Sequence, residues 1–171
     1  GTATGASGAP LSAAEITQAA RDSVRAIMMI RAFRMRGHLH ANLDPLGIAN
    51  PLEDYNELSP SSYGFSEADL NRKIFIDGVL GLEYATVREM VDILKRTYCS
   101  TLGVEFMHIH EPEKRRWIEA LFEQPATKWT REEHLRIVDK LNEAEIFETF
   151  LQTKFVGQKR FSLEGGESTI V

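Results

Sequence analysis

The chain has 171 residues, of which 43% are hydrophobic and 26% are charged, an ordinary composition for a soluble globular domain. Its net charge of −5 argues mildly against nucleic acid as the main partner, because phosphate binding requires a basic face. The single cysteine, Cys99, excludes a disulfide scaffold, and no apolar run approaches the ~20 residues that cross a bilayer. We therefore expect one hydrophobic core, a reducing compartment and no membrane attachment.

The two ends differ in composition from the middle of the chain. Residues 1–10 (GTATGASGAP) are small, which predicts a linker or a remnant of cloning rather than part of the fold. Residues 11–157 carry the spacings of a helical domain. Residues 158–171 begin a further element where the chain stops. These features together indicate a fragment of a longer protein.

Helix starts are marked by capping boxes, in which a Ser or Thr caps the helix and a Glu three residues later reaches back to it. The three pairs are Ser12 with Glu15, Thr86 with Glu89, and Thr130 with Glu133. Pro112 suits the first position of another helix. A looser pattern at Asn142 indicates that the last helical stretch restarts there.

Apolar residues at helical spacing follow each of these starts. In the helix that begins after Ser12 we predict one buried stripe, with further apolar residues on other faces. The middle of this helix should therefore be buried almost all round. The stripe comprises Ile16, Ala20, Val24, Ile27, Met28 and Met35, and the additional residues are Met29, Ile30 and Phe33. Later stripes are Val87, Met90, Val91, Leu94 and Tyr98; Trp117, Ile118, Leu121 and Phe122; Leu135, Val138 and Leu141; and Phe147, Leu151 and Phe155.

The remaining segments are less regular. Residues 66–76 predict a shorter helix, and residues 104–109 (VEFMHI) fit either a short strand or a helix continuation. Residues 42–65 contain three prolines and little periodicity, which predicts a long ordered connection of the kind that often serves a site or an interface. The fold class predicted is mainly α, with about five to seven helices and at most one or two short strands.

Candidate site residues cluster after the first helix. Arg36 and His38 flank Gly37, and they either contact an anion or substrate or simply cap the helix and pack against neighbours. Asp44 begins an Asp-Pro-Leu-Gly sequence, which is typical of a type I turn and could also shape a site. His108 and His110 lack a third ligand at suitable spacing, so no metal site is predicted.

A second hypothesis concerns the basic residues of the first helix. Arg31, Arg34 and Arg36 could form a small basic patch in a non-enzymatic helical interaction module, which would meet an acidic partner. This hypothesis requires the three guanidinium groups to be exposed. It loses its motivation if they pair with carboxylates of the same chain.

Three motifs together resemble one enzyme family. They are IRAFRMRGH followed by LDPLGI in residues 30–48, YC followed by GVEFMHI in residues 98–109, and KRFSLEGGE in residues 159–167. Their order and spacing are similar to those of the decarboxylating first component of the 2-oxoglutarate dehydrogenase complex, of bacterial or mitochondrial type. The resemblance covers residues 12–171.

This resemblance implies an oxidoreductase of the tricarboxylic acid cycle that uses thiamine diphosphate and Mg²⁺. Such an enzyme decarboxylates 2-oxoglutarate and passes the succinyl group to a lipoyl arm of the dihydrolipoyl succinyltransferase core. It also implies a homodimer in the bacterial cytoplasm or the mitochondrial matrix. A 2-oxoadipate-selective relative stays open as an alternative, because substrate-selecting residues lie downstream in the family.

The family's catalytic, cofactor-binding and metal-binding residues also lie beyond the last motif. None is therefore expected in this chain, and Arg36, His38 and Asp44 are at most adjacent to a site. Residues 158–171 resemble the lead-in to the cofactor-binding α/β domain. We expect the fragment alone to be inactive. We also expect Phe161, Leu163 and Ile170 to be exposed, which predicts self-association or poor order at this end.

Overall fold

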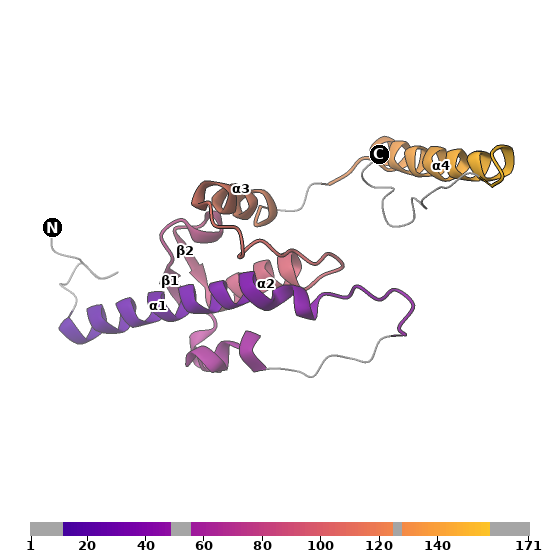
Figure 1. Cartoon of the computed structure of the whole chain (residues 1–171). Helices are drawn as coiled ribbons and strands as arrows, with labels where there is room; N and C mark the ends of the chain where they lie inside the picture. The colour runs from indigo at the N-terminus through magenta and orange to yellow at the C-terminus, as the bar shows by residue number, and fades with distance from the viewer. Residues whose placement is uncertain (1–11, 49–55, 125–127, 158–171) are drawn as a thin grey trace. The chain divides into compact units, whose positions relative to one another are not determined.

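The computed structural model describes residues 12–48, 56–124 and 128–157 (Figure 1). Its contacts divide the chain into two compact units, residues 1–125 and residues 126–171. The described part of the first unit contains helices α1 (Ala13–Arg36), α2 (Val87–Tyr98) and α3 (Pro112–Phe122), and that of the second contains α4 (Arg131–Lys154). The mainly helical fold expected from the sequence is confirmed. The segments 1–10 and 158–171, with Phe161, Leu163 and Ile170, lie outside the described residues.

The helix starts form as the sequence predicts. In α1 the Ser12 hydroxyl accepts a hydrogen bond from the Glu15 backbone N–H at 3.2 Å, and the Glu15 carboxylate accepts from the Ser12 N–H at 2.8 Å. The same reciprocal pair opens α2 at Thr86 and α4 at Thr130. Pro112 occupies the start of α3. These local contacts satisfy backbone donors that a helix start leaves unpaired.

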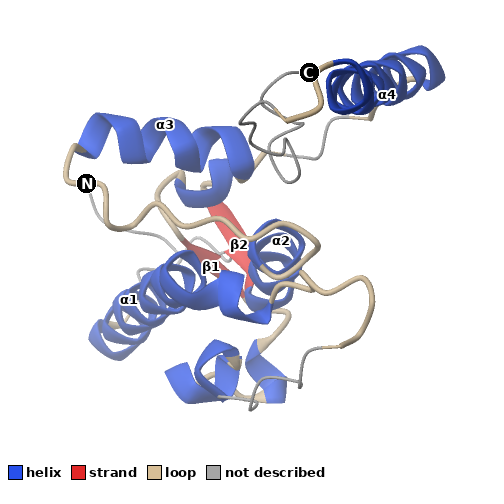
Figure 2. Ribbon diagram, turned by 45° about the vertical axis from the view of Figure 1, so that its right-hand side comes forward, coloured by secondary structure: helices blue, strands red, loops and turns tan. Residues whose placement is uncertain are grey.

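Short elements connect the helices of the first unit. A hairpin of β1 (Lys73–Phe75) and β2 (Tyr84–Thr86) pairs antiparallel, with Ile74 opposite Ala85. Figure 2 shows its two strands lying next to α1 and α2. Five 3₁₀ turns also occur in the described ranges, at Gly37–His40, Asn56–Leu58, Pro60–Tyr63, Glu67–Asp69 and Val79–Gly81.

The predicted helix over residues 66–76 is wrong. Ser66 caps only the single turn Glu67–Asp69, and the chain then extends into β1. Ile74 and Ile76 are buried on either side of exposed Phe75, which is the alternation of a strand. Residues 104–109 form neither a strand nor a helix, although Val104 and Phe106 are buried in the core.

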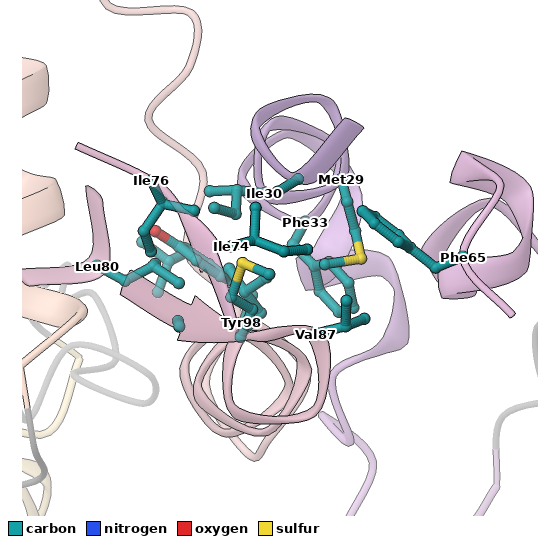
Figure 3. Close-up of a cluster of buried hydrophobic side chains, with 14 of the residues drawn as sticks. Met29, Ile30, Phe33, Phe65, Ile74, Ile76, Leu80, Val87 and Tyr98 are labelled. Atoms are coloured by element: carbon teal, nitrogen blue, oxygen red, sulfur yellow. The ribbon is translucent and has the colours of Figure 1, made fainter. Parts of the chain in front are cut away.

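The core of the first unit lies between α1, α2 and the hairpin. Figure 3 shows Met29, Ile30 and Phe33 of α1 together with Ile74 of β1 and Val87 of α2, and all five are nearly inaccessible to solvent. The predicted stripe of α2 is confirmed, because its main members are buried and Val91 is partly buried against them. This packing, rather than helix propensity, supplies most of the stabilisation of these elements.

The predicted buried stripe of α1 is wrong, and so is the expectation that the middle of this helix is buried almost all round. Val24 is 60% exposed and Met28 is 56% exposed, and Ile16, Ile27 and Met35 are also exposed. The buried face carries Asp22, Ala26, Met29, Ile30, Ala32 and Phe33. The hairpin and α2 contact only one side of α1, so its second apolar face has no partner among the described residues.

The later stripes are only partly buried. On α3, Ile118 and Phe122 pack against the core, whereas Trp117 is 66% exposed and Leu121 is exposed. In the second unit α4 runs without interruption through Asn142, so the predicted restart is absent. The described side chains of α4 are mostly exposed, including Leu135, Val138 and Phe147, and Ala144 is buried. None of the described helices has the length and apolar character of a membrane span.

Gly37 gives a direct test of the packing between the end of α1 and α2. Its φ of −55° is available to any residue, but a Cβ atom at this position would lie 2.4 Å from Cβ of Tyr98. We expect Gly37→Ala to lower the free energy of unfolding by about 2 kcal/mol, because the end of α1 and α2 must move apart to make room for the methyl group. Urea unfolding followed by circular dichroism measures the change.

The matched control is Gly103→Ala, whose new methyl group would have a Leu43 side-chain carbon at 3.4 Å as its nearest neighbour and Cβ of His38 at 3.7 Å, both at ordinary contact distances. We expect this variant to unfold at nearly the urea concentration of the unaltered chain. Equal stability of the Gly37 and Gly103 variants would contradict the close approach of Gly37 to α2.

Candidate functional site

The sequence placed its candidate site residues at the end of α1, and the structure gives each of them a separate partner. The Arg36 guanidinium forms an ion pair with Glu57, and both side chains are substantially exposed. Nε2 of His38 lies 3.6 Å from the carboxylate of Glu105. Nδ1 of His38 is buried and has no hydrogen-bond partner in the described residues. Arg36 and His38 therefore point to different carboxylates.

Asp44 forms the predicted turn. Its carboxylate accepts a hydrogen bond from the Leu46 backbone N–H at 3.1 Å, and its carbonyl accepts one from the Gly47 N–H at 3.2 Å. Gly47 has φ of +65°, a conformation that glycine adopts without strain. The contacts described for Asp44 are thus contacts of a turn, and those described for Arg36, His38 and Asp44 do not join them into one site.

The most highly organised polar group of the first unit lies where α1, α2 and α3 meet. The Arg34 guanidinium donates to both carboxylate oxygens of Glu123, at 2.7 and 2.8 Å. The Tyr98 hydroxyl donates to Oε1 of Glu123 at 2.8 Å. Glu119 adds a second, looser ion pair to Arg34 at 3.3 Å. We call Arg34, Tyr98 and Glu123 the interhelical triad.

Burial makes the interhelical triad sensitive to its charge state. Glu123 is only 6% exposed, and Tyr98 is fully buried. Burial, together with the neighbouring Glu123 carboxylate, raises the pKa of Tyr98 far above its usual value. Burial alone would lower the pKa of Arg34, but the hydrogen bond and charge of Glu123 outweigh it and raise that pKa. The triad therefore holds a charged pair and a neutral phenol.

Sequence reasoning did not single out Glu123 or the hydroxyl of Tyr98. One signal was available in the sequence. Tyr98 ends an otherwise apolar stripe, and a buried tyrosine hydroxyl usually has a hydrogen-bond partner. The predicted basic patch is also wrong for two of its three members. Arg34 pairs with Glu123 and Arg36 pairs with Glu57, so only Arg31 remains without a carboxylate partner among the described residues.

A second buried carboxylate ties α1 to the segment before β1. Asp22 is 4% exposed and accepts a hydrogen bond from Arg72 at 2.7 Å and another from Gln18 at 3.0 Å. Burial of an unpaired carboxylate would be costly, and these two donors offset that cost. Asp22 therefore has a structural role on the buried face of α1.

The described residues offer little that is typical of an active centre. No group of three or more His, Cys, Asp or Glu residues lies close enough to hold a metal ion in the described ranges. Cys99 is partly buried, and this burial raises the pKa of its thiol. A raised pKa leaves the thiol protonated and weakly nucleophilic at neutral pH. Internal ion pairs join the buried carboxylates of the described residues to arginines.

Removing the charge of Glu123 tests the interhelical triad. We expect Glu123→Gln to lower the free energy of unfolding by about 3 kcal/mol, because the buried Arg34 guanidinium loses its counter-charge. Glu119→Gln is the matched control, since this glutamate makes only the longer contact and is more exposed. A Glu123 variant no less stable than the Glu119 variant in urea unfolding would contradict the assignment.

Tyr98 should make the stability of the first unit fall in alkali. Its pKa is raised in the folded state, so above about pH 10 the unfolded chain releases a proton that the folded chain keeps. We expect the free energy of unfolding to decrease by up to about 1.4 kcal/mol per pH unit above that point. Urea unfolding at about pH 9 and about pH 11 measures the slope, and Tyr98→Phe should flatten it. An identical alkaline slope in the variant would rule out Tyr98 as its source.

The comparisons with known proteins give one consistent result. No family model matches the chain. It is 66% identical, over 99% of its own length, to proteins named 2-oxoglutarate dehydrogenase E1 component from Brucella ovis, Brucella canis and Brucella suis. It spans 17% of the length of these curated relatives. Along nearly all its residues, the chain is thus similar to the N-terminal 17% of 2-oxoglutarate dehydrogenase E1 components.

Proposed function

We propose that the chain forms the amino-terminal helical region of a 2-oxoglutarate dehydrogenase E1 component. The observation that supports this proposal best is the 66% identity over 99% of the chain. The intact enzyme would decarboxylate 2-oxoglutarate and transfer the succinyl group to the lipoyl arm of the succinyltransferase core. The relatives are named for 2-oxoglutarate, which favours this substrate over 2-oxoadipate.

We also propose that chemistry in the intact enzyme depends on thiamine diphosphate and Mg²⁺, the cofactor serving as the electron sink. The described residues do not fit this group. They provide no cluster of carboxylate or imidazole ligands suited to a divalent cation, and their buried carboxylates, Asp22 and Glu123, are engaged by arginines. We therefore assign no step of the reaction to them.

The role proposed for the first unit is to position a loop. The interhelical triad and the Gly37–Tyr98 contact hold the end of α1 against α2 and α3. The following segment carries Asp44 and strongly exposed apolar side chains, among them Leu46 at 78% and Ile48 at 80%. Such a surface suits contact with another part of the enzyme, so Arg36, His38 and Asp44 would lie at an internal boundary rather than at the reacting atoms.

The proposal extends to assembly and location. The intact enzyme would be a homodimer that works with the succinyltransferase core of the same complex. The bacterial cytoplasm is favoured over the mitochondrial matrix as its location, because the relatives reported above come from Brucella.

One experiment tests the proposed inactivity of the isolated chain. We expect the purified 171-residue chain to release no carbon dioxide from 2-oxoglutarate in the presence of thiamine diphosphate and Mg²⁺. Isothermal calorimetry should likewise detect no binding of thiamine diphosphate. Sustained turnover by the pure chain, at a rate proportional to its concentration, would show that this part of the proposal is wrong.

A chimera tests the proposed function itself. The matching region of the Brucella ovis relative is replaced by this chain, and NADH formation is measured with the other components of the complex present. We expect activity comparable to that of the unaltered relative, because two thirds of the exchanged residues are identical. The same relative without this region is the control. A chimera that folds and binds thiamine diphosphate yet forms no NADH would overturn the proposal.

A further inference from the structure

A cavity of about 250 Å³ lies between α1 and α3 in the first unit. Its wall carries four arginines, Arg31 and Arg34 of α1 and Arg115 and Arg116 of α3, and one glutamate, Glu119. The chain as a whole has a net charge of −5, so this concentration of positive charge departs from its average. A cavity lined in this way is suited to an anionic group.

The four arginines differ in their contacts. Arg34 is neutralised by Glu123 and Glu119, as described for the interhelical triad. The side chains of Arg31, Arg115 and Arg116 have no hydrogen bond or ion pair among the described residues. Arg31 and Arg116 are exposed, and Arg115 is partly exposed. Three guanidinium groups therefore remain available to a ligand, and each can donate two parallel hydrogen bonds to a carboxylate.

The same cavity also has an apolar side. Its wall also includes Ile27, Ile30, Val79 and Met107. Ile27 belongs to the exposed face of α1 together with Val24 and Met28. The apolar surface therefore continues from the cavity along the helix. Its extent exceeds what a single small anion can cover.

We propose that this surface binds an acidic polypeptide segment of a partner protein. We call Arg31, Arg115 and Arg116 with the adjacent Ile27 the arginine pocket. Carboxylates of the segment would pair with the three arginines, and its apolar side chains would cover Ile27, Val24 and Met28. A phosphate ion would engage the guanidinium groups but would leave this apolar face in water, so the mixed chemistry favours a peptide.

This inference keeps part of the basic-patch hypothesis and changes its geometry. Arg31 belongs to both sites. Arg34 and Arg36 are excluded because they form internal ion pairs. Arg115 and Arg116 are added from α3, which is distant in the sequence. The site is separate from the proposed role in the dehydrogenase, and it can be tested on the chain alone.

Binding of a model peptide tests the proposal. The probe is a fluorescein-labelled peptide of repeated Glu-Glu-Leu-Leu units, and its anisotropy is measured during titration with the 171-residue chain. We expect Arg31→Gln or Arg115→Gln to weaken binding about tenfold, because each removes one charge-assisted contact. Arg21→Gln is the matched control, since Arg21 is an exposed arginine of α1 that does not line the cavity. It should bind as the unaltered chain does.

A charge reversal makes the test specific. Arg31→Glu should weaken binding of the acidic peptide more than Arg31→Gln does, because it adds a repulsive charge as well as removing a favourable one. A peptide of Gln-Gln-Leu-Leu units should bind the unaltered chain at least tenfold more weakly than the acidic one. Circular dichroism of each variant verifies that it is folded.

Three results would overturn the proposal. The first is an equal loss of binding in the Arg21 control and the Arg31 variant, which would mean that attraction is not specific to the pocket. The second is equal binding of the acidic and glutamine peptides, or no binding of either. The third is displacement of the acidic peptide by inorganic phosphate but not by sodium chloride of the same ionic strength, which would assign the site to a small anion.

Discussion

The buried ion pair between Arg34 and Glu123 is the interaction on which the arrangement of the first unit depends. It joins α1 to the end of α3, and the hydroxyl of Tyr98 brings α2 to the same carboxylate. Removing two charges from water is costly, and the cost is offset only because the geometry is bidentate and the remaining acceptor capacity is used. Loss of either partner would leave the other charge buried and unpaired, so both are needed to hold the three helices in this arrangement.

The rest of the unit combines this polar constraint with a small apolar core. Phe33 of α1 and Tyr98 of α2 are buried, and Ile74 of the hairpin is buried in the same core. The core occupies one side of α1 and leaves Val24 and Met28 in solvent. Apolar surface of this extent on a helix is typical of an interface, and on α1 it adjoins the arginine pocket.

The described part of the first unit holds its charged and nucleophilic groups in structural contacts. Its buried carboxylates are engaged in ion pairs, its thiol is kept protonated by burial, and the side chains of Arg36 and His38 meet different glutamates. The residues that carried the family resemblance largely have packing or turn roles in this unit. Gly37 permits close contact with Tyr98, and Gly47 completes the Asp44 turn.

The sequence by itself determined the helix starts, the mainly helical class and the buried stripe of α2, because capping and one-sided periodicity are local properties. It could not decide which of the two apolar faces of α1 is buried, since Met28 and Met29 are equally apolar and only the position of the hairpin distinguishes them. It also could not show that Arg34 meets Glu123, or that Arg31 and Arg115 line one cavity. These outcomes depend on contacts between residues distant in the chain, and only tertiary packing brings those residues together.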